Sequence, residues 1–176
     1  MSDSIRRAEP GEGAKLQELA AATFGLACPP GTPAADIVDF VATQLSEERF
    51  ESYLADPRRE IVIATIDDRF AGYSMLVFGE PTDPDVGAVV TARPAVELSK
   101  FYLRAEGHGS GLASLLMGST LDAARVRGSL VVWLGVNQQN IRANRFYEKC
   151  GFAVSGTKTF ALGDRLEDDY VRALVL

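Results

Sequence analysis

The first third of the chain carries apolar residues at the spacing of one helical face, which predicts three helices. The first starts near Pro10, the second covers Ala34 to about Leu45, and the third follows Ser46, a suitable N-cap. The prolines of Cys28–Pro33 separate the first two helices because proline cannot continue a helix. A short edge strand is expected before them at Ile5–Ala8.

Runs of β-branched and aromatic residues predict most of the sheet. In chain order the expected strands are Ile61–Ile66, Phe70–Phe78, Ala95–Leu103, Leu130–Val136, Phe152–Leu162 and Tyr170–Leu176. The tight link Asp67–Arg69 indicates a hairpin. The segment Gly79–Pro94 is rich in Gly, Pro and Asp, so an exposed loop containing a short strand at Val86–Val90 is expected.

Two more helices are predicted in the second half. One follows a glycine turn after Leu103, with its apolar face formed by Leu112, Leu115, Leu116, Ala123 and Val126. The other covers Asn137–Lys149, and Gly151 is well placed as its left-handed C-cap. This order of elements predicts an α/β protein, with one sheet and helices on both of its faces.

Composition narrows the class of protein. The 176 residues, 47% hydrophobic and 24% charged, suit one soluble domain. The net charge of −6 without a Lys/Arg cluster argues against nucleic-acid binding and modestly favours a cationic substrate. The chain shows neither a bilayer-length apolar run nor a signal peptide. Cys28, Cys150 and a single histidine give no metal-ligand spacing, so we expect no metal and a cytoplasmic location.

The segment His108-Gly-Ser-Gly-Leu-Ala113 lies between a strand and a helix. A helix that begins in this way directs free backbone N–H groups and the positive end of its dipole at whatever lies above the turn. Because glycines let a bulky anion approach the main chain, a phosphate or pyrophosphate is the natural ligand. The alternative is an ordinary glycine turn that only reverses the chain.

The helix that ends near Lys149 carries an unusual polar face. Asn140, Ala143, Asn144 and Tyr147 share one side, whereas the solvated side carries Arg142, Arg145, Glu148 and Lys149. A small residue flanked by two amides and a phenol is suited to be the wall of a narrow polar site. A half-buried helix whose tyrosine covers the core is the alternative.

Together these two segments resemble the GCN5-related N-acetyltransferase (GNAT) family. The family turn Gln/Arg-x-x-Gly-x-Gly/Ala matches His108–Ala113, with histidine replacing the usual first residue. The second signature is matched by Asn140, Ala143, Phe146, Tyr147, Glu148, Lys149, Gly151 and Phe152. Trp133–Val136 and Asp168–Val171 are similar to segments of members that acetylate polyamines and other small amines. The resemblance implies the GNAT fold: a single three-layer α-β-α domain over residues 1–176, with a mixed, largely antiparallel sheet of about seven strands.

The resemblance also implies acetyl-coenzyme A as co-substrate. Main-chain groups of the strand before the turn would pair with its pantetheine, and amides of the turn would hold its pyrophosphate, as would a charged His108. The cofactor-binding residues implied are Phe101, Tyr102, Leu103, His108, Gly109, Ser110, Gly111, Leu112, Ala113, Ser114, Asn140, Ala143, Asn144 and Tyr147.

Two residues are expected to move protons. Tyr147 is the candidate general acid, because a phenol of pKa about 10 can donate to a departing thiolate whose conjugate acid has a pKa of about 8.5. Glu97 is the candidate general base, expected to share a strand face with Ser99, Phe101 and Leu103; a structural role such as pairing with Lys100 is the alternative. Asp168 and Asp169 suit an exposed acidic turn better than a grip on a cationic acceptor.

The expected reaction is direct transfer of acetyl to the primary amine of a small molecule. Acetylation of a protein lysine or N-terminus, and a non-catalytic acyl-coenzyme A-binding module, are the alternatives. We expect the acceptor pocket to be built from the N-terminal helices and the Gly79–Pro94 loop. A homodimer is possible, because dimers are common for the fold.

Overall fold

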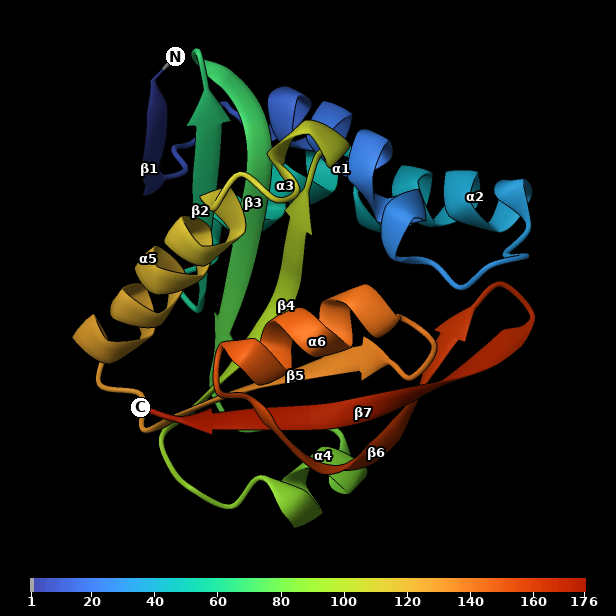
Figure 1. Ribbon diagram of the computed structural model, residues 1–176, viewed down its shortest axis with the longest axis vertical. Helices are drawn as coiled ribbons and strands as arrows, with labels where there is room; N and C mark the ends of the chain where they lie inside the picture. The colour runs from blue at the N-terminus through green and yellow to red at the C-terminus, as the bar shows by residue number, and fades with distance from the viewer. Residues whose placement is uncertain (1) are drawn as a thin grey trace.

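A computed structural model describes residues 2–176, which form a seven-stranded sheet of order β1-β2-β3-β4-β5-β7-β6 (Figure 1). Neighbouring strands pair antiparallel, except for the parallel pair β4 and β5. In chain order the elements are β1 (Asp3–Arg7), α1 (Gly13–Ala27), α2 (Ala34–Gln44), α3 (Glu47–Ala55), β2 (Arg59–Ile66), β3 (Arg69–Phe78), α4 (Pro84–Val89), β4 (Ala95–Leu103), the 3-10 turn η1 (Ala105–Gly107), α5 (Leu112–Val126), β5 (Val131–Asn137), α6 (Ile141–Lys149), β6 (Ala153–Leu162) and β7 (Arg165–Val175).

Helices cover both faces of this sheet, which confirms the three-layer arrangement (Figure 1). Leu16 of α1 and Phe50 of α3 pack against Tyr73 of β3 on one face. On the other face, Met117 of α5 and Tyr147 of α6 belong to a second core. The edge position of β1 and the hairpin between β2 and β3 are also confirmed.

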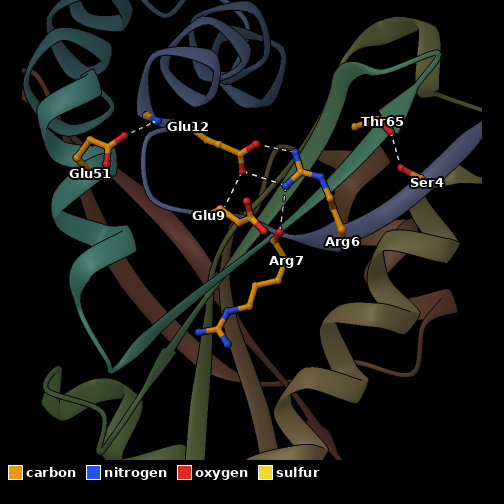
Figure 2. Close-up of polar contacts among 8 residues, drawn as sticks. Ser4, Arg6, Arg7, Glu9, Glu12, Glu51 and Thr65 are labelled. Carbon is orange, nitrogen blue, oxygen red and sulfur yellow. Dashed lines mark hydrogen bonds and ion pairs between the residues drawn. The ribbon is translucent and has the colours of Figure 1, made fainter.

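The N-terminal end of α1 is held by a polar network (Figure 2). The guanidinium of Arg6 in β1 donates to both carboxylate oxygens of Glu12, at 2.6 and 3.0 Å. Arg6 accordingly holds the pKa of Glu12 below its ordinary value. The N–H groups of Gly11 and Gly13 donate to Glu51 of α3. This network ties α1 to the sheet edge and to α3, and so fixes the helix that covers the site.

A β-bulge at Ser99 interrupts the regular alternation of β4. Met75 of β3 faces Lys100, but the adjacent Leu76 faces Leu98, so Ser99 is an extra residue on β4. A bulge of this kind reverses the face on which every later side chain lies. The bulge therefore determines which side chains of β4 lie on the same face and can contact one another.

Glu97 lies on the face covered by α1–α3, together with Lys100 and Tyr102. Phe101 and Leu103 pack on the opposite face, against α5 and α6. The expectation that Glu97 shares a face with Phe101 and Leu103 is wrong, because it assumed unbroken alternation past Ser99; Ser99 itself lines the same cavity as Glu97. Glu97 and Lys100, three residues apart, are brought together instead.

The parallel pairing of β4 with β5 extends only over Ala95–Glu97. Beyond Glu97 the two strands separate, although β4 continues to pair with β3 as far as Leu103. The backbone edge of β4 that faces β5 is therefore left for another partner over the last part of the strand. This separation opens the sheet in its middle.

Two expected elements differ from the structure. The residues 86–90 belong largely to α4 instead of a strand, because Pro84 occupies its first turn and Asp83 caps it by accepting from the Asp85 N–H. The predicted helix Asn137–Lys149 begins only at Ile141, since Asn137 still pairs within the sheet.

The buried face of α5 is also shifted from the expected one. Leu115 and Val126, expected to be buried, are 55% and 86% exposed, whereas Met117, Leu121 and Ala124 pack in the core. In addition, β7 begins at Arg165 instead of Tyr170, which extends the final hairpin. No helix in the described part of the chain has the length and apolarity needed to span a membrane.

Candidate active site

Two connected depressions lie where β4 and β5 separate. The first, called the groove, runs between β4, the glycine turn and α6; its lining includes Leu103, His108, Gly109, Ala113, Arg142 and Phe146. The second, called the cavity, lies on the face covered by α1 and α2 and has a volume of about 250 Å³. The residues that line both are Ala27, Phe101, Tyr102, Asn140, Ala143 and Tyr147. The structure thus brings the two predicted segments to one site.

The glycine turn presents free backbone donors at the start of α5. Gly109 and Gly111 have φ values of 77° and 89°, which side chains other than Asn and Asp rarely adopt. The N–H groups of Gly109, Gly111, Ala113 and Ser114 donate no hydrogen bond to residues 2–176. A Cβ added at either glycine would meet open space. The turn therefore has the donors and the room that a phosphate requires.

Ser110 and Leu112 are directed away from this open side. The Ser110 hydroxyl donates to the Gly107 carbonyl at 2.8 Å and accepts from the Leu112 N–H at 3.3 Å. The side chain of Leu112 is fully buried in the core beside β2 and β3. Both residues brace the turn, and the backbone N–H of Ser110 donates no hydrogen bond to residues 2–176.

His108 contacts a residue that the sequence placed on the solvated side of α6. The Arg142 guanidinium lies 2.5 Å from His108 Nδ1. Because arginine can only donate, this nitrogen is the acceptor of the contact. Arg142 brings a positive charge to the mouth of the groove, which was not predicted from the sequence because the contact joins two distant segments.

Asn140 is a helix cap that also contacts α1. Its carboxamide oxygen accepts from the Ala143 N–H at 3.1 Å, and its nitrogen donates to the Ala27 carbonyl at 3.4 Å. Ala143 follows on the same face and leaves the passage between groove and cavity open. Asn140 therefore fixes the start of α6 against the end of α1, on the wall of the site.

Asn144 lies outside the lining of both depressions and has structural partners instead. Its nitrogen donates to the carbonyls of Asn137 and Asn140, and its oxygen accepts from Arg172 at 3.0 Å. Arg172, only 7% exposed, also donates to the Phe152 carbonyl. This buried network holds α6 onto β7.

Replacement of Asn144 by alanine is expected to lower the free energy of unfolding by about 2–3 kcal/mol, because a buried guanidinium loses a partner. Urea denaturation measures the change. Arg145→Ala is the control on the same helix, since Arg145 is exposed. Equal stability of both variants would contradict the structural role of Asn144.

Tyr147 stands between the groove and the cavity. Its ring is 8% exposed and makes edge contacts with Phe101 and Phe152, with centroids 6.2 and 5.9 Å apart. Burial raises the pKa of its phenol well above the ordinary value. The phenol consequently keeps its proton at neutral pH, as a proton donor must.

Glu97 lines the cavity at the point where β4 and β5 separate. Burial raises the pKa of its carboxyl, while Lys158, Lys100 and Arg59 act in the opposite direction. Lys100 also lines the cavity, and burial lowers the pKa of its ammonium to about 8. A carboxylate with a raised pKa is a stronger proton acceptor than an exposed one.

The far wall of the cavity comes from β6 and β7 instead of the Gly79–Pro94 loop. Lys158 of β6 and Asp169 of β7 form an ion pair at 3.7 Å, and Glu167 lies beside them. Asp169 and Glu167 are 6% and 8% exposed, so the expected acidic turn is wrong for this part of β7; Asp168 alone is exposed. The N-terminal helices do contribute, as expected, through α1, α2 and the intervening loop.

Several further lining residues were not predicted from the sequence. Cys28, which was placed in a loop, is half-buried and lines the cavity with Phe24 and Phe40. Burial is the main cause that raises the pKa of its thiol, which disfavours a nucleophilic thiolate. The proline-rich composition around Cys28 gave no indication of this position. Among residues 2–176, no group of three His, Cys, Asp or Glu side chains could hold a metal ion.

Comparisons with known proteins show which proteins this chain resembles in sequence and in fold. The profile described as "Acetyltransferase (GNAT) family" matches residues 26–152. The uncharacterized N-acetyltransferase Rv2669 of Mycobacterium tuberculosis (strain H37Rv) is 48% identical over 157 residues, 89% of this chain and 93% of its own. The fold is similar to that of the PaiA N-acetyltransferase of Thermoplasma acidophilum in complex with coenzyme A (TM-score 0.79, 19% identity, 100% of both chains). It also resembles the ribosomal-protein-S18-alanine N-acetyltransferase of Escherichia coli (TM-score 0.68, 18% identity, 99% of this chain and 94% of the other).

Proposed function

The chain belongs to the acetyltransferase (GNAT) family, and we propose that it transfers acetyl from acetyl-coenzyme A directly to the primary amine of a small molecule. The observation that carries this proposal is the position of the Tyr147 phenol, at the junction of an anion-binding groove and a charged cavity. The groove suits the acyl donor, and the cavity suits the amine. Direct transfer needs the two to meet, and the depressions meet at Tyr147.

The residues of the groove fit acetyl-coenzyme A, which supplies an acetyl group activated as a thioester when it is bound. Free N–H groups at Gly109, Gly111, Ala113 and Ser114 would hold phosphate oxygens, with Arg142 adding charge. The unpaired edge of β4 over residues 101–103 offers backbone groups to an amide-containing chain, in the manner of an added strand. Asn140 and Ala143 form the opposite wall.

Each of the two proton transfers has its own residue: Glu97 accepts a proton and Tyr147 donates one. An alkylamine of pKa about 10 is almost wholly protonated at neutral pH, so a base must remove a proton before attack. Glu97 faces the cavity and accepts that proton, directly or through water, because burial has raised its pKa. Tyr147 donates to the departing sulfur from the other side of the junction. Free backbone N–H groups of β4 near the junction would stabilise negative charge on the acyl oxygen.

The cavity supports a small cationic acceptor. Three carboxylates, those of Glu97, Glu167 and Asp169, line it along with the ammonium groups of Lys100 and Lys158. Its volume of about 250 Å³ lies near the lower end of the range for small-molecule sites, which begins at roughly 300 Å³. We further propose a cytoplasmic location, in which the thiols of Cys28 and Cys150 remain free.

An acetyltransferase assay tests the proposal. Release of free thiol from acetyl-coenzyme A is followed with polyamines, amino acids, aminoglycosides and peptides as acceptors. We expect turnover with at least one small amine and little with peptides. Turnover only with peptides would favour a protein lysine or N-terminal acetyltransferase. Binding of acetyl-coenzyme A without turnover on any acceptor would favour a non-catalytic module and contradict the proposal.

Replacement of Glu97 by glutamine is expected to lower kcat/KM about 100-fold at neutral pH, because the amide cannot accept the proton. In the unmodified protein kcat/KM should rise with pH as Glu97 ionises, above the ordinary glutamate value of about 4.3 because burial raises this pKa. The variant should lack that rise. Glu148→Gln, on the exposed face of α6, is the control. If kcat/KM of Glu97→Gln kept the same pH dependence as the unmodified protein, another residue would be the base.

A further inference from the structure

At Gly135 of β5, which lines the cavity, the end of a side chain from β6 lies against the backbone. A Cβ built at Gly135 would overlap Lys158 Cε and would stand 3.1 Å from its Nζ and 3.2 Å from Asp169 Oδ2. Gly135 pairs with Val171 of β7 and has no left-handed φ. The backbone conformation does not call for a glycine here, but a side chain at this position would have to displace the end of Lys158.

The space above Gly135 is filled by the buried end of Lys158. Its side chain is 15% exposed, starts from β6 and crosses β7 to reach the cavity. Its ammonium lies 3.7 Å from Asp169, whose side chain is 9% exposed. The same ammonium lines the cavity together with Glu97, and its charge favours the ionised form of that carboxyl. The Lys158 ammonium therefore interacts with two carboxylates, that of Glu97 on β4 and that of Asp169 on β7.

We propose that Lys158 is a positioning residue that keeps Glu97 ionised as the proton acceptor, and that the bare backbone of Gly135 lets its ammonium reach this place. The proposal rests on the proposed function, because it assigns the proton acceptor of that reaction its counter-charge. Glu97 takes a proton from the acceptor ammonium and becomes neutral. The neutral acid then returns the proton to solvent, and Lys158 favours that return.

Burial and the nearby positive charges shift the pKa of the Glu97 carboxyl in opposite directions. Their balance decides whether Glu97 can accept a proton. Burial raises the pKa of the Glu97 carboxyl and so favours its protonated form, and a protonated acid cannot be a base. The charged groups around it are Lys100 on its own strand, Arg59 on β2, Lys158 on β6, and Asp169 with Glu167 on β7. Lys158, Lys100 and Arg59 favour the ionised carboxylate and so oppose the effect of burial.

Lys100 is less suited to this role than Lys158, although it is nearer along the chain. Its ammonium lies 5.6 Å from the centroid of the Tyr53 ring, toward α3. Burial lowers its pKa to about 8, so part of its charge is lost at mildly alkaline pH. Arg59 is also directed to the Tyr53 ring, 4.7 Å from its centroid. Lys158 is the cation held by a carboxylate of the cavity itself.

The test is a direct titration of Glu97. Protein labelled with ¹³C at glutamate carboxyls is titrated by NMR, and the Glu97 signal is assigned by its loss in Glu97→Gln. Lys158→Met is expected to move the midpoint upward by about one pH unit, and Lys158→Arg to restore most of the shift, since an opposite charge nearby typically changes a pKa by one to three units. The acid limb of kcat/KM should move in parallel. Lys149→Met, which removes an exposed lysine, should move neither.

Gly135→Ala is the second variant, in case loss of the ion pair destabilises Lys158→Met. It removes no charge but displaces the end of Lys158, so it should also raise the Glu97 midpoint. An unchanged midpoint in both Lys158→Met and Gly135→Ala would overturn the proposal. Because this readout needs no turnover, it separates the two hypotheses: a shifted midpoint in a protein that acetylates nothing would support the role of Lys158 and contradict only the proposed function.

Discussion

Replacement of Gly111 by aspartate is expected to abolish binding of acetyl-coenzyme A, whereas replacement by asparagine should leave most of it. The φ of 89° at Gly111 is accessible to both residues, and a Cβ there meets open space. The two variants therefore differ chiefly in charge. An aspartate carboxylate would stand before the free N–H groups that begin α5, compete for them, and repel a phosphate.

Isothermal titration measures the effect. We expect Kd to rise at least about 100-fold for Gly111→Asp, which corresponds to about 2.7 kcal/mol, and less than about tenfold for Gly111→Asn. Gly118→Asp is the matched control, because Gly118 is an exposed glycine of the same helix with nothing within 4 Å of an added Cβ. If Gly118→Asp weakened binding as much as Gly111→Asp, general acidity of α5 and not the turn would be responsible.

The features that the sequence predicted well are local. The glycine turn is specified within a few consecutive residues, so a single sequence reveals it. Gly151 likewise adopts the left-handed conformation expected after α6, with φ of 99°. The order of strands and helices also sufficed for the fold class, because mixed connectivity of this kind allows few arrangements.

The features that the sequence did not predict depend on pairing between distant segments. The bulge at Ser99 follows from the register of β4 against β3, and this register places Glu97 beside Lys100. The burial of Asp169 follows from its pairing with Asn137 and Lys158. A one-residue change of register reverses every side chain, so periodicity along one strand cannot settle these positions.

The contrast between local features and features that depend on distant pairing matters most for the acceptor side of the site. The donor side is assembled largely from the glycine turn and α6, each of which is a short continuous segment of the sequence. The cavity instead combines α1, α2, β4 and the hairpin of β6 and β7, which lie far apart along the chain. Its charged residues, such as Lys158 and Glu167, became candidates only when the fold placed them together.

Replacement of Tyr147 by phenylalanine is expected to reduce kcat by about 10²- to 10⁴-fold, the usual contribution of a positioned proton donor. The Kd for acetyl-coenzyme A should change less than about twofold, since the ring contacts with Phe101 and Phe152 do not involve the hydroxyl. Because burial raises the phenol pKa, no basic limb from Tyr147 should appear below its ordinary value of about 10.

Steady-state kinetics with the best acceptor, together with titration of acetyl-coenzyme A, separate catalysis from binding. Tyr170→Phe is the matched control: it removes a phenol from β7, next to the same core but outside the lining of both depressions. Equal losses of kcat and affinity in Tyr147→Phe would indicate that the phenol is only a wall of the site. A large loss confined to kcat, absent from Tyr170→Phe, would identify the hydroxyl itself as the group that acts on the departing sulfur.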